Sequence, residues 1–319
     1  MLHVRVTCLP DRTDEVVRIF LDECGTTNVV RLPGAVVSPA GDLVQAEVAR
    51  EAVDDLLRRL RALGAHGWGS LVVQGVETAL GADVERAEAE APGEGEDAVI
   101  WDQLAEETIA RAKPTATFLA FLVIATLIAA VGLLIDSTVL IVGAMVLGPE
   151  FAPLAGLAVA LVTRRWHDAR TPLRALAVGF ALAVAVAALG VWLLDLAGQV
   201  PEAFVEGHRP LTSFVAAPDV FSVVVALLAG TAGTLSLTGG KDSPLVGVFI
   251  SVTTVPAAAD VAAGAVTGQL ATAGGAAVQL VVNLGCIVAA AAGTLALQRA
   301  YWRRVRRRHP ERRAAVRRA

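Results

Sequence analysis

The chain has 319 residues, of which 55% are hydrophobic and 18% are charged, with a mean hydropathy of +0.61 and a net charge of −4. This composition excludes an ordinary soluble globular protein, because such chains carry about 25% charged residues. The charges are unevenly distributed: the 184 residues from 115 to 298 hold 15 of them, and the last 21 residues hold ten arginines and one acid. The chain therefore divides into a charged front, an apolar middle and a basic tail.

The front of the chain has no basic segment followed by an apolar one, so it lacks the pattern of a secretory signal. We expect this part to stay in the cytoplasm. Three cysteines (Cys8, Cys24 and Cys286) are too few for a disulfide framework. They are expected to be reduced and buried.

Residues 1–80 show the alternation of strands and the periodicity of helices in turn. The order β-α-β-β-α-β predicts an α+β domain of the ferredoxin-like type, and Pro33 and Gly34 are expected to turn the chain between the second and third strands. Strands are predicted at 2–8, 27–32, 42–49 and 68–76, and helices at 13–24 and 51–63. No phosphate-binding loop or metal-ligand spacing is present, so the sequence predicts neither a cofactor nor a metal, and a sensing role rests on fold analogy alone.

The segment between the front and the apolar middle is acidic and rich in glycine. Residues 81–98 lack apolar periodicity and are predicted to form a flexible, self-repelling linker. Residues 99–114 place Trp101 and other apolar side chains on one helical face, which predicts an amphipathic helix that lies along the membrane surface or forms a collar.

Residues 115–298 contain segments long enough to cross a bilayer as helices, which requires about 20 apolar residues. Basic residues lie before the first segment, between the second and third and after the last, whereas Asp136 and an acidic loop with Glu202, Glu206 and Asp219 fall on the other side. The positive-inside rule then predicts a multi-pass protein of the plasma membrane with both termini cytoplasmic. The six predicted spans are 115–134, 138–163, 171–196, 222–239, 245–265 and 274–298.

The tail, 299–319, is expected to bind anionic lipid rather than nucleic acid, because it adjoins a membrane span. The Gly- and Ala-rich spans are also compatible with a homo-oligomer.

The apolar middle contains two related halves. Asp136-Ser137 and Asp242-Ser243 each precede a Val-Gly pair and then a proline inside the span. With three spans in each half, the second copy has to be inverted relative to the first. Inverted repeats with broken helices are typical of secondary transporters, whose binding sites lie near the midplane.

The second span cannot be a continuous helix, because Pro149 and Pro153 remove two backbone donors. Half-helices at 138–147 and 150–163 are expected, with Glu150 in the first turn of the second one. A carboxylate is favoured there by the helix dipole, but at this depth it needs a partner, a proton or water. A transport site and a structural cap are equally compatible with this pattern.

The fifth span is expected to break at Pro256, beside Ser251, Thr253 and Thr254. Asp260 lies one turn further along, and as an intramembrane aspartate it is a candidate site, although its position toward the outer end also allows simple contact with water. In the sixth span, Gln279 and Asn283 lie on one face. They are interpreted either as packing contacts or as the lining of a polar path.

The motifs GAMVLGPEFAPL (143–154) and GGKDSPLVGV (239–248) resemble a large bacterial family of membrane proteins, the domain of unknown function 389 family, over most of the chain. A second proline is expected beside Pro256, where this chain has Ala257. The resemblance implies a polytopic inner-membrane protein, often with a cytoplasmic front domain, and implies no substrate.

No nucleophile–base pair, phosphate loop or metal set points to an enzyme. The leading hypothesis is a transporter or channel for a small solute or ion, with Glu150 and Asp260 as proton or cation sites and the front domain as regulator. The alternative is a membrane sensor or scaffold that transports nothing and whose front domain binds a ligand or partner. The bilayer and an unidentified small solute or ion are thus the expected partners.

Overall fold

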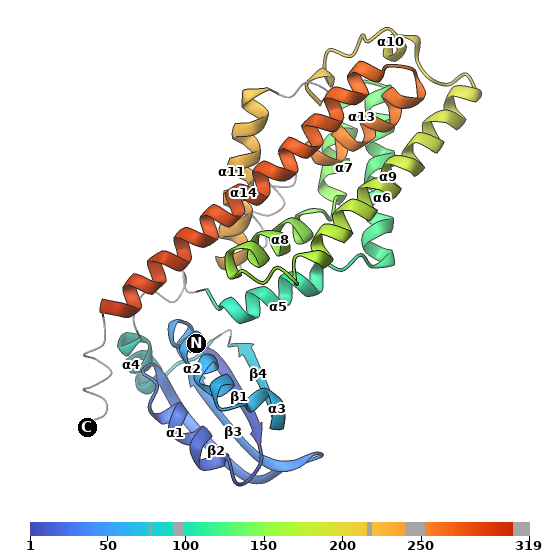
Figure 1. Ribbon diagram of the computed structural model, residues 1–319. Coiled ribbons are helices and arrows are strands. Elements are labelled where there is room, and N and C mark those ends of the chain that lie inside the picture. Colours follow the sequence, from blue (N-terminus) through green and yellow to red (C-terminus); the bar gives the residue numbers. More distant parts are fainter. Residues whose placement is uncertain (77, 92–98, 216–218, 240–252, 309–319) are drawn as a thin grey trace. The chain divides into compact units, whose positions relative to one another are not determined.

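The computed structural model describes residues 1–319 except 77, 92–98, 216–218, 240–252 and 309–319. The chain forms two compact units (Figure 1). The N-terminal unit comprises Met1–Gln103 and Gln298–Ala319, and the helical unit comprises Leu104–Leu297. The helical unit therefore starts before residue 115, the predicted start of the membrane domain, because it includes most of the predicted interfacial helix, α5 (Trp101–Arg111).

The N-terminal unit is built on a four-stranded antiparallel sheet with strand order β2-β3-β1-β4. This order interleaves two β-α-β steps, as the sequence predicts. The strands are β1 (Leu2–Cys8), β2 (Thr26–Val37), β3 (Ala40–Val48) and β4 (Ser70–Gly75), and the helices are α1 (Thr13–Leu21), α2 (Arg50–Ala62) and the short α3 (Ala65–Trp68).

One face of this sheet is covered by α1 and α2 (Figure 1). Alternate residues of β1 point into the core, where Val4 and Val6 meet Phe20 of α1 and Leu56 of α2, all fully buried. The sequence shows apolar residues at every second position of β1 and along one stripe of α1 and of α2. These patterns explain why the predicted strand and helices agree with the observed ones.

The hairpin of β2 and β3 is longer than predicted, and the expected turn at Pro33 and Gly34 is wrong. Both residues lie inside β2, at a register shift between Leu32 and Val36, and the chain turns after Val37 instead. The physical reason is the backbone of Gly34, whose φ of +63° suits a bulge as well as a turn. Pro33 is tolerated because β2 is an edge strand.

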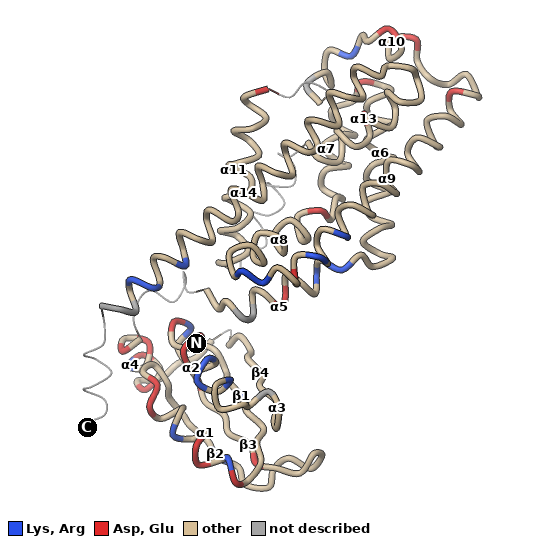
Figure 2. Tube along the Cα trace, viewed as in Figure 1, with Lys and Arg blue, Asp and Glu red and all other residues tan. Residues whose placement is uncertain are grey.

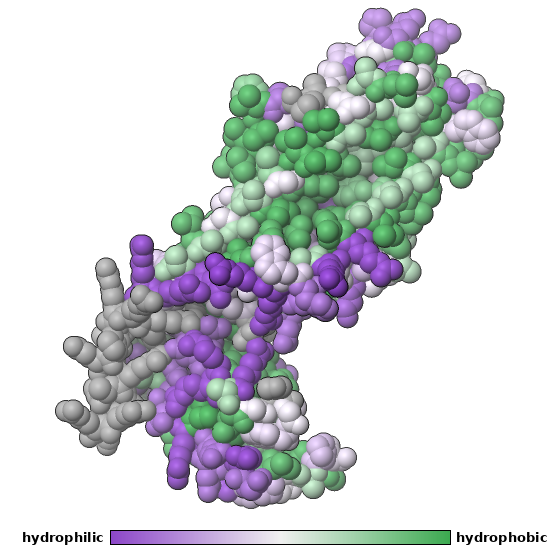
Figure 3. Space-filling model, viewed as in Figure 1, coloured by the Kyte–Doolittle hydropathy of each residue, from purple (hydrophilic) through white to green (hydrophobic). Residues whose placement is uncertain are grey.

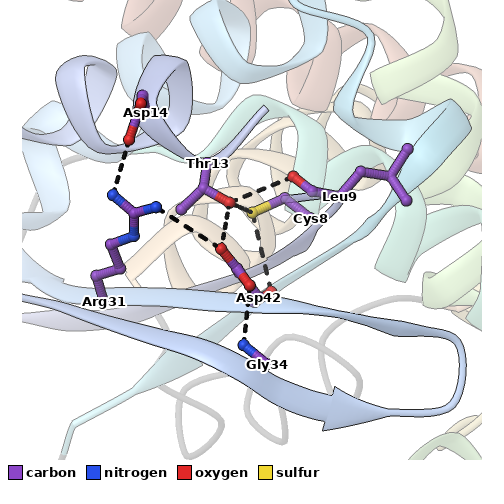
Figure 4. Close-up of polar contacts among 7 residues, drawn as sticks. All are labelled: Cys8, Leu9, Thr13, Asp14, Arg31, Gly34 and Asp42. Carbon is purple, nitrogen blue, oxygen red and sulfur yellow. Dashed lines mark hydrogen bonds and ion pairs between the residues drawn. The ribbon is translucent and has the colours of Figure 1, made fainter. Parts of the chain in front are cut away.

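A buried carboxylate fastens this bulge to the start of α1 (Figure 4). Asp42 accepts hydrogen bonds from the Gly34 N–H at 2.9 Å and from the Thr13 hydroxyl at 2.7 Å, and the Arg31 guanidinium lies 3.9 Å away. These hydrogen bonds hold the pKa of Asp42 below its ordinary value, and the bond from the Gly34 N–H has the largest effect. The adjacent Cys8 thiol lies 3.4 Å from the Thr13 hydroxyl, and burial raises its pKa, which disfavours the reactive thiolate.

The predicted flexible linker 81–98 is wrong over its first half. Ala82–Glu90 forms helix α4, with Val84 and Ala87 buried, and residues 92–98 lie outside the described part of the chain. A short apolar stripe is present within the acidic sequence, because one helical face carries Val84, Ala87 and Ala91. Alanine and glutamate, which fill much of this segment, also favour a helix. Gly25 permits the close approach of α4, because a Cβ there would lie 3.1 Å from the Ala91 Cβ.

Among its described residues, the helical unit contains four helices that are long and apolar enough to cross a membrane, or five if one bent pair counts as a single span. The four are α6 (Ala116–Leu134), α9 (Arg170–Leu196), α11 (Val220–Gly239) and α14 (Leu270–Arg308), and the bent pair is α7 (Thr138–Leu147) with α8 (Phe151–Thr163). The shorter elements are α10 (Glu202–Val205), the 3-10 turn η2 (Ser213–Val215) and α13 (Thr254–Val266).

These elements coincide with five of the six predicted spans. For the fifth, 245–265, the structure describes only the helix from Thr254 onward, and the junction around Lys241, Asp242, Ser243 and Pro244 lies outside the described residues. At the other junction, Ser137 caps α7 as predicted, its hydroxyl accepting from the Leu140 N–H at 3.5 Å.

The surface of the helical unit is apolar between two charged ends. The face in Figure 3 is mostly hydrophobic along these helices. On α6, α9 and α11, the exposed side chains include Phe121, Ile124, Leu189, Leu193 and Leu228. A soluble monomer rarely exposes so large an apolar surface, and a bilayer would cover it.

We call the two charged ends the basic end and the acidic end of the helical unit (Figure 2). Gly156 of α8 marks the basic end, because it contacts Pro172 of α9 and Ala112 after α5, close to Arg111, Lys113, Arg164, Arg165, Arg170 and Arg174. At the acidic end, Asp136 accepts hydrogen bonds from the Leu211 N–H at 3.2 Å and the Thr212 hydroxyl at 2.8 Å, within the connection that carries Glu202 and Glu206.

Candidate functional site

The second span is broken where the sequence predicts. Helix α7 ends at Leu147, α8 begins at Phe151, and the two are bent by 52°. Pro153 is the third residue of α8, where a helix has no partner for the missing N–H, so the proline costs nothing there. Glu150 occupies the N-cap position, one residue before the first turn in which it was expected.

The fifth span contains a helix start of the same form. Thr253 is the N-cap of α13, and Pro256 is the third residue of that helix, the position that Pro153 holds in α8. Pro256 therefore begins a helix rather than bending one within the described residues. Ala257, where the family resemblance suggests a second proline, continues α13 without interruption.

The two half-helices begin at the same place and run to opposite ends of the helical unit. The Thr254 hydroxyl donates a 2.5 Å hydrogen bond to Oε1 of Glu150, which joins the start of α13 to the start of α8. Helix α8 ends at the basic end, beside Arg164, whereas α13 leads to Gln269, whose amide donates to the Phe204 carbonyl of α10 at 2.8 Å. Each half-helix has 13 residues, or about 20 Å at 1.5 Å per residue.

Glu150 lies deep within this junction, with 6% of its surface exposed. Its second oxygen, Oε2, is buried and has no hydrogen-bond partner among the described residues. Gly148 leaves just enough room for that oxygen, because a Cβ on Gly148 would collide with it and would come within 2.9 Å of Val255. Within the described part of the chain, the junction therefore holds a carboxyl group with one hydrogen-bonded oxygen and one oxygen without a hydrogen-bond partner.

A line of polar side chains leads from the junction to α14. The Asn283 amide donates to the Thr253 hydroxyl at 2.9 Å, and the Gln279 amide donates to the Asn283 Oδ1 at 3.4 Å. Gln279 and Asn283 are 0% and 2% exposed, and the Gln279 Oε1 has no partner among the residues that the structure describes. By contrast, Thr234 and Thr238 of α11 donate to carbonyls of their own helix, so these hydroxyls are satisfied locally.

Asp260 is not part of this junction. Its carboxylate is completely buried and forms a two-pronged ion pair with Arg209, with N–O distances of 2.6 and 3.3 Å. The Arg209 guanidinium also lies over the Phe204 ring, 4.9 Å from its centre. This charge is thus compensated by an arginine.

Sequence reasoning missed Arg209, because the connection that carries it was interpreted only as an acidic loop. The positive charge of Arg209 was the feature of the sequence that could have revealed it. Arg209 is a single basic residue between Glu202, Glu206 and Asp219, on the side from which the positive-inside rule excludes basic residues. An intramembrane acid and a misplaced base are expected to pair.

Of the residues predicted to form a site, the structure brings together Glu150, Thr253, Thr254 and Asn283, with Pro149, Pro153 and Pro256 at the helix starts, and it separates Asp260 from them. Among the described residues, no group of three or more His, Cys, Asp or Glu side chains is arranged to hold a metal ion.

Comparison with known proteins assigns this region to a family. Residues 145–289 match the family described as "Domain of unknown function (DUF389)". These residues belong to the DUF389 family. The match is narrower than the resemblance over most of the chain that the motifs suggest, but it contains α8, α13, the Arg209–Asp260 pair and Asn283. No curated protein and no solved structure matches the chain.

Proposed function

We propose that this DUF389 protein is a transporter or channel for a small solute or ion, with Glu150 at the centre of its path. The observation that carries the proposal is the junction itself, where two half-helices of opposite direction begin at one buried carboxyl group. Broken helices that meet inside the membrane are the usual sites of secondary transporters.

The order of elements supports an inverted repeat of three plus three spans. The first half contains α6, the broken pair α7 and α8, and α9; the second contains α11, the segment that ends in α13, and α14. The equal lengths of α8 and α13 and the shared place of their prolines are the correspondence expected from such a repeat. Six crossings then return both termini to one side of the membrane.

The basic end would face the cytoplasm of the cell and the acidic end the outside, by the positive-inside rule. This orientation places the protein in the plasma membrane, with the N-terminal unit as a cytoplasmic regulator. Under it, α8 leads from the junction toward the cytoplasm and α13 leads toward the outside, so that Glu150 lies near the middle of the bilayer.

Glu150 would act by binding and releasing a proton or another cation. An unpaired charge at the centre of a membrane helix costs at least about 2.5 kcal/mol, and the positive ends of two helices offset part of that cost. Oε2, which has no hydrogen-bond partner in the part of the chain that the structure describes, is the atom at which a proton, a cation or a donor group of the solute would bind.

The test is ion, proton and solute flux into liposomes containing the purified protein, under an imposed gradient. We expect wild type to conduct and Glu150→Gln to be inactive, because glutamine keeps the shape and the Thr254 contact but cannot exchange a proton. Asp195→Asn, the same change at an exposed carboxyl group near the end of α9, is the matched control and should leave flux unchanged.

Thermal unfolding in detergent checks that Glu150→Gln is folded. Wild-type flux across a broad solute panel that is indistinguishable from empty liposomes would overturn the proposal and favour the sensor or scaffold. Equal flux in wild type and a folded Glu150→Gln would show that the path avoids the junction.

A further inference from the structure

The connection between α9 and α11 folds over the end of α13 rather than extending away from it. We call residues 201–215 the cap segment; it comprises α10, a turn and η2 (Figure 1). Its Phe204 and Val215 side chains are 1% and 0% exposed and belong to the core of the helical unit. A loop whose apolar side chains enter the core is packed as part of the unit.

Three polar contacts fasten the cap segment, each to a different place. Arg209 binds Asp260 on α13, Leu211 and Thr212 bind Asp136 between α6 and α7, and the Phe204 carbonyl accepts from Gln269 after α13. Other cap residues are exposed, among them Glu206 and His208, whose carboxylate oxygen and ring nitrogen lie 3.3 Å apart. The segment is thus held at a few points by contacts between side chains and short backbone stretches.

The Arg209–Asp260 pair lies between the cap segment and the junction. Asp260 is six residues beyond Thr254 on α13, which is about 9 Å along the helix axis. The pair is buried, since Arg209 is 5% exposed and Asp260 is 0% exposed. On α13, the pair therefore lies between the junction and the end of the helix that the cap segment contacts through Gln269.

We propose that the Arg209–Asp260 pair is the gate of the path at the acidic end, and that the cap segment is the part that moves when the gate opens. The inference rests on the proposed transport function and extends it to the residues that separate Glu150 from the acidic side. A charge pair suits a gate, because each group becomes hydrated when the pair separates, whereas an apolar plug would expose its surface to water.

The gate is tested by labelling, which does not require transport. A cysteine replaces Ala257, which lies one turn nearer the junction than Asp260 on the same helical face, in a chain whose Cys8, Cys24 and Cys286 are changed to Ala. A membrane-impermeant maleimide is added to the acidic side of proteoliposomes. We expect slow labelling with the pair intact and labelling at least about tenfold faster in Asp260→Asn or Arg209→Gln, as expected for an equilibrium shifted by about 1.4 kcal/mol or more.

The matched control is Glu206→Gln, which removes an exposed carboxylate of the same segment and should leave the labelling rate unchanged. Arg209→Lys, which keeps the charge without the two-pronged geometry, should give an intermediate rate. Unchanged labelling in folded Asp260→Asn and Arg209→Gln would overturn the gate, as would fast labelling with the pair intact.

A second experiment leaves the pair in place, in case its variants do not fold. Cysteines at Asp136 and Thr212, whose side chains are in contact, are joined by copper phenanthroline, with the same three native cysteines removed. We expect the disulfide to suppress both flux and labelling of the cysteine that replaces Ala257, and a reducing agent to restore both. Labelling that continues in the cross-linked protein would contradict the gate, whereas absent flux in every form with regulated labelling would contradict the transport function alone.

Discussion

Gly148 decides how closely the Glu150 carboxyl group fits the junction. A Cβ at this position would meet Oε2 of Glu150 and the Val255 side chain, which belong to two different half-helices. The carboxyl group cannot simply swing away, because its other oxygen is bonded to Thr254. A glycine is therefore required here by space.

We predict that Gly148→Ala displaces the Glu150 carboxyl group, lowers the stability by about 1–3 kcal/mol, as overpacking does, and reduces flux. The measurements are thermal unfolding and the liposome assay. Gly143→Ala is the matched control, because the space around Gly143 is open and alanine favours the helix by up to about 1 kcal/mol. Equal effects of the two changes would show that the tight fit at Gly148 is unimportant.

Asp42 makes the stability of the N-terminal unit depend on pH in the acidic range. Because its pKa in the folded protein lies below the ordinary value of 3.8, its hydrogen bonds stabilise the fold above that pH, and this contribution disappears as pH falls through the lower, folded value. We predict that Asp42→Asn weakens protection of the β1 amides against hydrogen exchange at pH 7, and that the difference from wild type diminishes as the pH falls below the ordinary pKa of the carboxyl group and through its folded value.

Asp14→Asn is the control for this change, because the Asp14 side chain is 75% exposed and its ion pair with Arg31 contributes little. A difference between wild type and Asp42→Asn that persists unchanged in acid would mean that the asparagine disturbs packing rather than removing a charge.

At the scale of elements, the close packing of α11 depends on glycine. A Cβ on Gly230 would lie 2.6 Å from the Ile287 carbonyl oxygen of α14, a backbone atom that cannot move aside. We predict that Gly230→Ala lowers the stability by about 1–3 kcal/mol, measured by thermal unfolding in detergent. Gly285→Ala on α14, where the added methyl group meets nothing, should be neutral or slightly stabilising. Equal stability of both variants would contradict this packing.

Sequence patterns predicted helices and strands well where the apolar residues lie on one face of the element, or where a proline or a capping residue marks its end. The strand 2–8, the half-helices on both sides of Pro149 and the Ser137 cap all depend on residues close in sequence. The α4 helix was missed because its short apolar stripe lies among acids, and the Pro33–Gly34 turn was wrong because a bulge and a turn use the same residues.

The candidate site was predictable in part. Glu150, Thr254 and Asn283 stood out as polar residues in apolar spans, but their contacts join positions 104 and 30 residues apart, which periodicity does not reveal. The same holds for Arg209 and Asp260, 51 residues apart. Pairing at such distances depends on how helices pack, so the sequence predicted the members of the site and missed the way in which they combine.

At the scale of the whole molecule, the proposed orientation makes a direct prediction. A single cysteine at His167, near the basic end, should be protected from impermeant maleimide in intact cells, and one at Glu206 in the cap segment should be labelled, since both side chains are exposed. The opposite pattern would invert the orientation. Labelling at both positions, or at neither, would contradict their placement on opposite sides of the membrane.

The position of the Glu150 carboxyl group between the acidic end and the basic end has an electrical consequence under the proposed orientation. A charge that reaches Glu150 from outside has crossed part of the membrane potential, and it crosses the rest on the way to the cytoplasm. Each half of a 100 mV potential amounts to about 1.1 kcal/mol, or roughly a sevenfold change in occupancy. In the proposed transporter, the resting potential would therefore assist both the binding of a cation from one side and its release to the other, and the occupancy of the carboxyl group would depend on voltage.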